Sequence, residues 1–426
     1  MRTAIDAFLC STLFVAVVLP HSVRCEEIVT SIAPPNTSAS LQFRGTSNGN
    51  LSGNTSVSKV NIHTLLYPAH TTKVLAHYLP WWGASSHINI GYSSTDPEQI
   101  ARTFDDIDSR GIDGIVVDWY GKGHFTDEAW QRSVPIIKRF PRLSFSIMID
   151  AGTFKWNRCM NCDLTQTILY HLDYASAKYL SSRQYLRYKG KPVVFEFGME
   201  GMGIVDWDHI QAAHPEILWV HTHRNGFNIE NSAGAFLWID PPPNPIRLAA
   251  ADTSQLENFY RYARSKPAKI AVGGVSKGFD DSLAEWAKTK PRYLPQSCGA
   301  TWLKSFEVLN KYFNTDRQLP FLQLITWNDY EEGTALETGI EGCVIVNARL
   351  NKHTLDVLLT HVETVDHLEL YEQVRPNAYR LIQRFPASTI TIPLPQSDYG
   401  TFFVEAVGKP FFRNVVSAPI LVPPGY

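Results

Sequence analysis

The chain carries little charge and no excess of either sign. Of its 426 residues 19% are charged, and the formal net charge is −2. Such a balance gives no reason to expect nucleic acid or an anionic membrane as a partner. The hydrophobic content of 44% is enough for a large core and a small additional domain,.

The N-terminus lacks a hydrophobic run long enough to span a membrane comfortably. The apolar run 7–20 follows Arg2 and precedes a small-residue cleavage site that ends at Cys25,. We therefore predict that residues 1–25 are a signal peptide and that the mature chain is secreted, extracellular or periplasmic, with no membrane attachment. A retained anchor and a lipid on Cys25 are alternatives. Polar residues within the run disfavour a retained anchor. The residues before Cys25 match a lipid-attachment site poorly.

Cysteine is scarce, and four cysteines remain beyond the predicted signal peptide. An even number in a secreted chain predicts disulfides, with three possible pairings. Cys159 and Cys162 are close enough in sequence for a tight loop bridge, and Cys298 would then pair with Cys343. No His pair at zinc spacing lies near these cysteines. We expect no metal and no other cofactor.

Residues 26–71 lack sustained hydrophobic periodicity. They are rich in Ser, Thr, Asn and Gly, which is typical of a linker or mobile arm,. Acceptor sequons occur at Asn36, Asn50 and Asn54,. They are either glycosylated in the mature protein or chance products of this composition.

Strands and helices are predicted to alternate through residues 72–342. Apolar runs with the length of buried strands lie at 74–82, 114–121, 145–150, 192–197, 218–223, 234–240, 269–275 and 321–325,. Helical patterns separate them; in the first, Asp96 is the expected N-cap before Pro97. Eight repeats predict an α/β fold, a closed (β/α)8 barrel. A doubly wound open sheet is the alternative, but it predicts no eightfold alternation, and no glycine-rich dinucleotide turn follows the first strand.

The last predicted strand runs directly into aromatic and acidic residues, and Gly333 then lets the chain turn sharply,. The carboxyl end of a barrel strand is where catalytic residues sit in this fold. Aromatic rings stack on the apolar face of a sugar, and two carboxyl groups can supply the acid and the base for glycosidic cleavage. The side chains concerned are Trp327, Asn328, Asp329, Glu331 and Glu332.

This stretch also resembles the signatures of known families. Its sequence is Asn328-Asp329-Tyr330-Glu331-Glu332-Gly333-Thr334-Ala335-Leu336-Glu337. It is similar to the Asn-Glu-Trp-His-Glu-Gly-Thr-x-Ile-Glu signature of glycoside hydrolase family 99, the endo-α-mannosidases. It also resembles the Trp-Asn-Asp-Tyr-Gly-Glu stretch of family 71, the fungal α-1,3-glucanases. About 250 residues earlier, His77-Tyr78-Leu79-Pro80-Trp81-Trp82-Gly83 is similar to the Tyr-Tyr-Pro-Trp-Tyr-Gly opening of the family 99 barrel.

The resemblance implies roles for two carboxyl groups. Glu332 matches the family 99 general acid, which protonates the departing oxygen. Asp329 matches the residue that acts as a base on the sugar's own 2-hydroxyl, giving net retention; family 71 is thought to invert, with the pair acting on water. This chain has Asp where family 99 has Glu, and Glu331 where family 99 has His. Because the aspartate side chain is shorter, it leaves room for a water molecule, and this favours inversion over retention.

Further side chains near the predicted carboxyl ends are candidates for substrate binding. The acidic ones are expected to bind sugar hydroxyls, or alternatively to cap helices or pair with Lys122 or Arg224. The aromatic ones are expected to form sugar subsites, or alternatively to belong to the core. His221 and His223 alternate on one strand, so a polar barrel layer is the alternative for His221. The candidates are Tyr78, Trp81, Trp82, Asp118, Trp119, Tyr120, Asp150, Glu196, His221, Asp240, Trp327, Asn328, Tyr330 and Glu337.

In residues 343–426 the pattern changes to that of short strands, in which apolar and polar residues alternate and which Asn, Pro or Gly residues separate,. We predict a small all-β sandwich. Its strands show no obvious row of exposed aromatic residues, so a structural accessory role is favoured over sugar binding.

The whole pattern predicts a secreted glycoside hydrolase that cleaves α-linked polysaccharide, glucan or mannan, in endo fashion. Two alternatives remain. One is a carbohydrate-binding protein without catalysis on the same barrel. The other is a cell-surface adhesion protein that acts through the sandwich.

Overall fold

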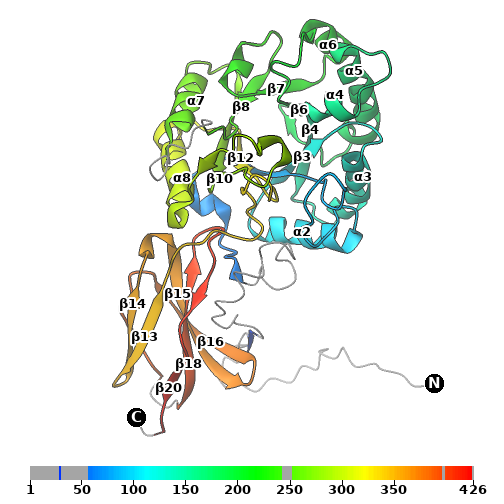
Figure 1. Ribbon diagram of the computed structural model, residues 1–426. Helices are drawn as coiled ribbons and strands as arrows, with labels where there is room; N and C mark the ends of the chain where they lie inside the picture. Colours follow the sequence, from blue (N-terminus) through cyan, green and yellow to red (C-terminus); the bar gives the residue numbers. More distant parts are fainter. Residues whose placement is uncertain (1–27, 30–55, 242–251, 396–398, 425–426) are drawn as a thin grey trace, which may run out of the picture.

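The computed structural model describes residues 28–29, 56–241, 252–395 and 399–424 (Figure 1). The predicted signal peptide and the three sequons lie outside the described residues. The described part divides into a mixed helix and strand body and an all-strand body, which Figure 1 shows one above the other.

The first body is built around a closed ring of parallel strands. Their order around the ring is β4-β3-β2-β12-β9-β8-β7-β6, and pairing of β6 with β4 closes it. This confirms the predicted barrel. The strands are β2 (Lys73–Tyr78), β3 (Gly114–Trp119), β4 (Ser144–Asp150), β6 (Lys191–Phe197), β7 (Leu218–Thr222), β8 (Gly234–Phe236), β9 (Ile270–Ser276) and β12 (Phe321–Ile325).

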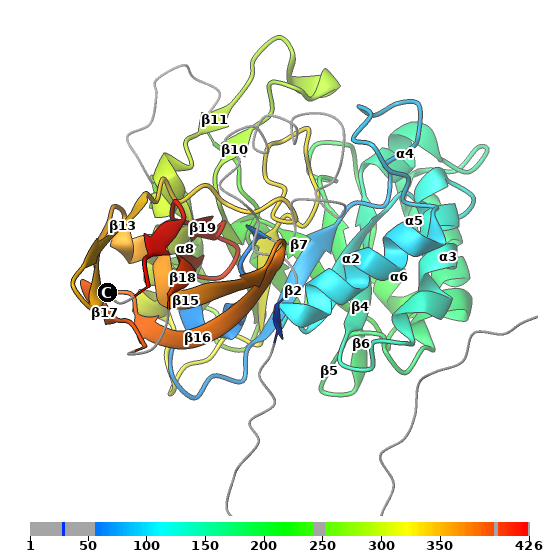
Figure 2. The same ribbon diagram turned by 90° about the horizontal axis from the view of Figure 1, so that it is seen from below.

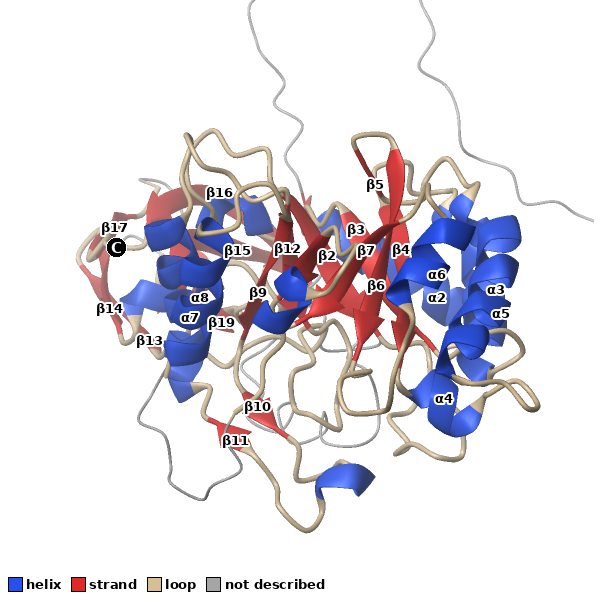
Figure 3. Ribbon diagram, turned by 90° about the horizontal axis from the view of Figure 1, so that it is seen from above, coloured by secondary structure: helices blue, strands red, loops and turns tan. Residues whose placement is uncertain are grey.

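Helices surround this ring (Figure 3). The longer ones are α2 (Pro97–Ser109), α3 (Phe125–Ile137), α5 (Leu164–Ala175), α6 (Trp207–Ala213), α7 (Ser254–Arg264) and α8 (Ala300–Tyr312). Between β7 and β8 the described connection holds a short 3-10 turn, η4 (Arg224–Asn228). The start of α2 is as predicted, because the Asp96 carboxylate accepts a hydrogen bond from the Glu98 amide at 2.9 Å and Pro97 occupies the first turn.

Short elements follow several strands. They are α4 (Gly152–Trp156) after β4, β5 (Arg187–Tyr188) pairing with β6, η5 (Glu285–Ala287), and the antiparallel pair β10 (Phe279–Asp280) and β11 (Tyr293–Leu294) after β9. Figures 2 and 3 both place α4 and the β10–β11 pair on the same side of the barrel.

Side chains of the barrel strands alternate between two cores. One set packs inside the ring, the lumen; it includes Leu75, Val116, Met148 and Phe195. The other set packs in the layer between strands and helices. Because successive side chains of a strand point to opposite faces, the position of a residue along its strand decides which core it joins.

The predicted linker 26–71 differs from the structure. Within it, β1 (Ile28–Val29) pairs with β16 of the second body, and Val57, Ile62 and Tyr67 are buried. A 3-10 turn, η2 (Ile62–Leu65), begins at Asn61, whose side chain accepts from the His63 amide. Ile62 and Tyr67 join the core between the strands and the helices without a repeating pattern, so periodicity does not reveal them.

The second body consists of two antiparallel sheets, as predicted. One contains β13 (Val346–Asn351), β14 (Thr354–Leu359) and β17 (Thr391–Pro393). The other contains β1, β15 (Val365–Arg375), β16 (Ala378–Pro386), β18 (Gly400–Gly408), β19 (Val415–Val416) and β20 (Ile420–Val422). Leu355 and Ile392 of the first sheet share a buried core with Leu368 and Val404 of the second, so the sheets pack face to face.

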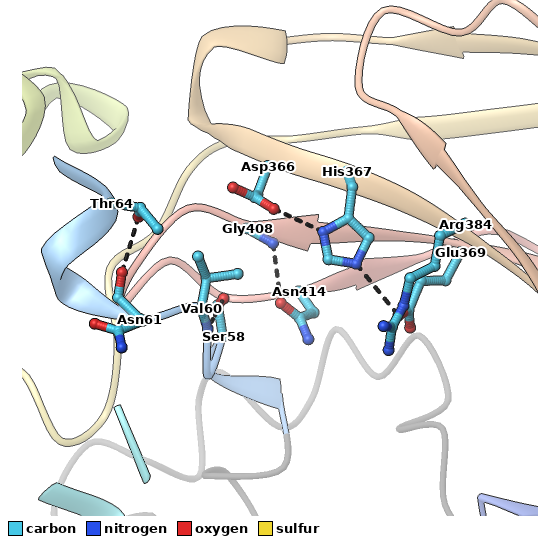
Figure 4. Close-up of polar contacts among 10 residues, drawn as sticks. All are labelled: Ser58, Val60, Asn61, Thr64, Asp366, His367, Glu369, Arg384, Gly408 and Asn414. Carbon is cyan, nitrogen blue, oxygen red and sulfur yellow. Dashed lines mark hydrogen bonds and ion pairs between the residues drawn. The ribbon is translucent and has the colours of Figure 1, made fainter. Parts of the chain in front are cut away.

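Near the start of β15, the opposite face carries polar side chains (Figure 4). His367 lies between Asp366 and Glu369, with its ring nitrogens 2.7 and 3.2 Å from the two carboxylates. The hydrogen bond to Glu369 raises the pKa of His367 above its ordinary value. Figure 4 shows the segment that contains Ser58 and Asn61 beside this face.

The two bodies are joined by aromatic packing and by a disulfide. Phe411 packs edge-on against Trp302 and Trp327 of the barrel, with ring centroids 5.8 and 6.2 Å apart. Disulfides join Cys298 to Cys343, and Cys159 to Cys162, as expected. None of the described helices is long and apolar enough to cross a membrane.

Candidate active site

The loop after β12 holds Asp329 and Glu332 in a tight turn. The Asp329 amide donates to Thr326 Oγ1, and the Glu332 amide donates to Asp329 Oδ1, both at 2.8 Å. Gly333 has a positive φ of 64°, which glycine adopts most readily,. The turn therefore places both carboxyl groups at the carboxyl end of the barrel, and both side chains are buried.

Two more carboxyl groups face the lumen at this end. Asp118 lies two residues beyond Val116 on β3, and Asp150 lies two residues beyond Met148 on β4; both valine and methionine belong to the lumen core. Strand alternation therefore directs both aspartates inward. Four buried carboxyl groups thus meet at one mouth of the barrel, and we call Asp118, Asp150, Asp329 and Glu332 the carboxyl cluster.

The environment of the cluster favours the protonated acids. Burial raises the pKa of Asp118 to about 8 and that of Asp329 to about 7,. Burial, followed by repulsion from Asp329, raises the pKa of Glu332 well above its ordinary value, although Arg292 opposes this. Burial and then repulsion from Asp118 do the same for Asp150. At neutral pH the cluster therefore holds protons that it can give away.

Two oxygens of the cluster are left without partners. Asp118 Oδ1 and Glu332 Oε2 are buried and accept no hydrogen bond from any described residue. Buried polar atoms are normally satisfied, so an unpartnered pair at the mouth of the barrel requires an explanation. A sugar hydroxyl, a glycosidic oxygen or a water molecule would satisfy them.

Tyr120 links the members of the cluster. Burial raises the pKa of its phenol well above the ordinary value, and all four carboxyl groups of the cluster raise it further. Gly152 makes room for it, because an added Cβ there would lie 2.5 Å from a Tyr120 ring carbon. The ring is half-buried, so it forms part of the site's surface.

Aromatic side chains form one wall beside Tyr120. Trp81 lies with its ring centroid 6.1 Å from that of Tyr120 and stacks on His87 at 4.5 Å. Trp82 is fully buried behind it and meets Tyr330 edge-on at 5.7 Å. Trp81, which is 4% exposed, and Trp82 thus pack in one apolar cluster with Tyr120 and Tyr330.

The loop after β12 is held by hydrogen bonds to the loop after β2. The Asn328 side chain accepts from the Leu79 amide at 2.9 Å and donates to the Leu79 carbonyl at 3.0 Å, and Trp82 Nε1 donates to the Asn328 carbonyl. Glu331 accepts from the Ile88 amide at 3.0 Å. Asn328 and Glu331 therefore fix the position of the turn that holds Asp329 and Glu332.

Glu337 lies beneath this turn and is fully buried. Its Oε1 accepts from Tyr330 at 2.6 Å and from Tyr92 at 3.0 Å. Burial raises its pKa to about 8. Instead of the predicted contact with substrate, Glu337 supports the turn, because it is buried and its Oε1 accepts from two tyrosine hydroxyls.

Three predicted sugar-binding rings lie outside the lumen. Tyr78 packs on Phe104 of α2, Trp119 stacks on Tyr174, and Trp327 packs on Phe411. Tyr78 and Trp119 follow His77 and Asp118 directly, so strand alternation turns them towards the helices. These three belong to the core, which was the alternative for Tyr78, and they leave the candidate site.

Two predicted polar residues are also turned outward. Glu196 follows the lumen residue Phe195, and its carboxylate contacts His221 Nδ1 at 3.0 Å. His221 in turn packs on Trp207. Instead of the expected contact with sugar, Glu196 and His221 share a buried hydrogen bond between the strands and the helices.

Asp240 lies apart from the cluster. Its carboxylate is about half exposed and pairs with Arg292 at 2.6 Å, while Arg292 also contacts Asp281 at 2.7 Å. Arg292, Asp281, His87 and Tyr92 were not anticipated. Their roles depend on contacts between loops, and no local pattern distinguishes them from other surface residues.

No group of three or more His, Cys, Asp or Glu side chains in the described parts of the chain is arranged to hold a metal ion. The donor set of the cluster fits proton transfer directly. The arrangement can thus bind a neutral, hydroxyl-rich molecule against rings and move protons at its polar atoms.

Comparisons with known proteins return structural similarity only. No protein-family model matches the sequence, and no curated protein matches it either. Two solved structures of the GH99 endo-alpha-mannosidase from Bacteroides thetaiotaomicron are similar. One, a complex with BIS-TRIS-propane, is 14% identical, covers 66% of this chain and 89% of that chain, and has a TM-score of 0.47.

The other GH99 structure is 16% identical, covers 63% of this chain and 88% of that chain, and has a TM-score of 0.46. A dihydropteroate synthase from Xanthomonas albilineans is also matched, at 13% identity and a TM-score of 0.29, over 59% of this chain and 86% of that chain. Similarity at this level assigns no activity or substrate to this chain.

Proposed function

We propose that this protein is a secreted glycoside hydrolase that cleaves α-linked polysaccharide, an α-glucan or an α-mannan. Glu332 is the general acid and Asp329 the base. The observation that carries the proposal is the unpartnered, buried Glu332 oxygen, which lies beside Asp329 in a turn at the mouth of the barrel.

The chemistry follows from the two environments. Glu332 holds its proton at neutral pH, because burial and repulsion from Asp329 oppose its ionisation. It gives that proton to the glycosidic oxygen as the bond to the anomeric carbon breaks. Asp329, whose pKa is about 7, takes a proton from the attacking hydroxyl of water or of the sugar. Two carboxyl groups in these roles are the usual machinery of glycosidic cleavage.

The remaining members of the cluster bind and orient the sugar. Asp118 and Asp150 offer carboxyl groups to hydroxyls from the β3 and β4 side of the mouth. Trp81 and Tyr120 supply the apolar wall against which a sugar ring rests. Secretion agrees with the two disulfides, which persist in oxidising compartments,.

A reducing-end assay on a panel of α-glucans and α-mannans tests the proposal. Wild type should release reducing ends from at least one polymer. Glu332→Gln should lower the rate by roughly 10⁴-fold, the upper range for one acid or base group. Glu98→Gln, at a side chain 88% exposed on α2, is the matched control and should leave the rate unchanged.

Two results would contradict the assignment. Near wild-type hydrolysis by Glu332→Gln would remove Glu332 as the acid. Binding of polymer by the wild type, with no release of reducing ends from any of them, would favour a carbohydrate-binding protein instead. An adhesion protein acting through the sandwich would keep its function when residues 72–340 are deleted.

A further inference from the structure

Exposed apolar side chains of the barrel gather at the mouth that holds the carboxyl cluster. Large hydrophobic side chains on a surface mark binding sites when they cluster. The exposed large hydrophobic side chains of the described barrel are Trp156, Met160, Tyr170, Met202, Ile204, Leu283, Trp286 and Tyr293. All of these except Tyr170 lie on segments that follow the carboxyl ends of strands.

Two tryptophans stand on opposite sides of this mouth. Trp156 ends α4, directly after β4, and is 62% exposed; Trp286 lies in η5, after β9, and is 53% exposed. In the ring order β4-β3-β2-β12-β9, four steps separate β4 from β9, which is half of an eight-stranded ring. Figure 3 shows α4 and the β10–β11 pair projecting from the same side of the barrel but well apart.

The acids lie between these two tryptophans. Asp118 comes from β3, and Asp329 and Glu332 follow β12, and both strands stand between β4 and β9 in the ring. A strand spacing of about 4.8 Å and a tilt of about 36° make such a ring roughly 15 Å across. A molecule that touches both tryptophans therefore spans the mouth on whose rim these acids stand.

Both tryptophans stand on loops that are tied to the cluster. Asn157, which follows Trp156, donates to the Tyr120 carbonyl at 2.8 Å. On the other side, the Asp280 amide donates to the Glu332 carbonyl at 2.8 Å, and Arg292 pairs with Asp281. Each ring is thus carried by a segment that is anchored within a few residues of the catalytic groups.

We infer that Trp156 and Trp286 are the two outer platforms for one saccharide chain, which lies across the mouth with an internal bond over Glu332. This rests on the proposed function and adds endo action to it, because sugars must extend on both sides of the cleaved bond. Indole rings suit the role, since they offer a broad apolar face at low cost in conformational entropy.

Exposed tryptophans can also bind a membrane, because their rings favour the interface between a bilayer and water. The geometry favours the saccharide. A bilayer resting on both tryptophans would cover the mouth and close it to a soluble polymer. The saccharide instead uses the rings and the acids together.

The test uses the full chain with Trp156→Ala, Trp286→Ala, the double variant, and Tyr399→Ala as control. Tyr399 is 67% exposed on the all-β body, away from the mouth. Affinity electrophoresis in gels containing soluble α-mannan or soluble α-glucan measures binding, and reducing-end release measures KM and kcat. The same variants are assayed on the shortest oligosaccharide that wild type cleaves.

Each tryptophan should contribute about three- to tenfold to polymer affinity, in line with other aromatic contacts. The double variant should lose more than either single variant, with kcat on the short oligosaccharide unchanged and Tyr399→Ala like wild type. Unchanged polymer affinity in the double variant would overturn the inference. So would an equal loss of kcat on short and long substrates, or weaker binding to phosphatidylcholine and phosphatidylserine vesicles with polymer binding intact.

The outcome is separable from that of the proposed function. If wild type binds α-mannan or α-glucan but cleaves neither, the hydrolase assignment fails, and the gel-binding comparison still decides the role of the tryptophans. If wild type cleaves polymer and the double variant binds it as well as wild type does, the assignment of the two tryptophans as platforms is wrong and the hydrolase assignment stands.

Discussion

Replacing Asp118 by Asn should stabilise the protein near neutral pH while it damages the site. Asp118 is buried, its Oδ1 has no partner among the described residues, and its Oδ2 lies 3.9 Å from His77 Nε2. Burial lowers the pKa of His77 to about 3, so His77 offers no positive charge at neutral pH. The folded protein must therefore keep a proton on Asp118 that the unfolded chain releases.

The size of the effect follows from the two pKa values. Burial raises the pKa of Asp118 from 3.8 to about 8 in the folded protein. Between these values the folded state binds more protons than the unfolded state, so stability falls as pH rises. From about pH 4.5 to about pH 7.5 the loss reaches roughly 4 kcal/mol, at ~1.4 kcal/mol per pH unit.

Asn does not titrate, so the variant should escape this loss. Its buried amide group adds a cost of about 1–3 kcal/mol if it finds no acceptor, but that cost is the same at both pH values. The quantity to measure is therefore the free energy of unfolding of Asp118→Asn minus that of wild type, at about pH 4.5 and about pH 7.5. Urea titration followed by tryptophan fluorescence provides both values.

We expect the free energy of unfolding of Asp118→Asn, relative to that of wild type, to be about 2–4 kcal/mol higher at about pH 7.5 than at about pH 4.5. Asp316→Asn, at an exposed aspartate in the loop before β12, controls for the general effect of removing a carboxylate and should show no such change. An Asp118→Asn difference that is equal at the two pH values would refute the reasoning. It would mean that Asp118 is ionised, and solvated or paired, in the folded protein.

Three further predictions concern the same end of the barrel. The pH profile of kcat/KM should rise through about pH 7, as Asp329 loses its proton, and fall at higher pH as Glu332 does; an optimum near pH 4 would contradict the assignment of the pair. Asn328→Ala should lower the free energy of unfolding by about 2–3 kcal/mol in urea titrations, because it leaves both backbone groups of Leu79 unsatisfied,; a loss below about 0.5 kcal/mol would show that water replaces the amide. Cys298→Ser should cost about 3–4 kcal/mol, because its disulfide to Cys343 spans 45 residues,; an equal loss in Cys343→Ser, which breaks the same bond, would confirm the disulfide as the cause.

The barrel could be predicted because each strand leaves a strong local signal. Gly114–Trp119 and Phe321–Ile325 are short, mostly apolar runs bounded by helical patterns, and such runs recur eight times,. The candidate acids could be predicted because they stand at the ends of such runs. Neither inference needs contacts between distant residues.

The direction of each side chain could not be predicted in the same way. A strand buried on both faces shows no alternation of apolar and polar residues, so the sequence does not say which face of β6 is the lumen. Asp118 and Asp150 point inward, whereas Glu196, at a similar place on its own strand, points outward to His221. A shift of one residue along the strand makes the difference, and only packing against the helices fixes it.

The contacts that hold the turn of Asp329 and Glu332 could not be predicted from the sequence either. They explain how the carboxyl cluster stays buried. Four buried carboxyl groups that resist ionisation lower the stability of the fold at neutral pH. A mobile loop would relieve this by moving Glu332 into water, where its pKa would return to the ordinary range and its proton would be lost. Asn328 and Glu331 prevent the movement by tying the turn to the chain near Leu79 and Ile88, about 240 residues away in sequence. The raised pKa of Glu332 is therefore a property of these tethers as much as of the acid itself.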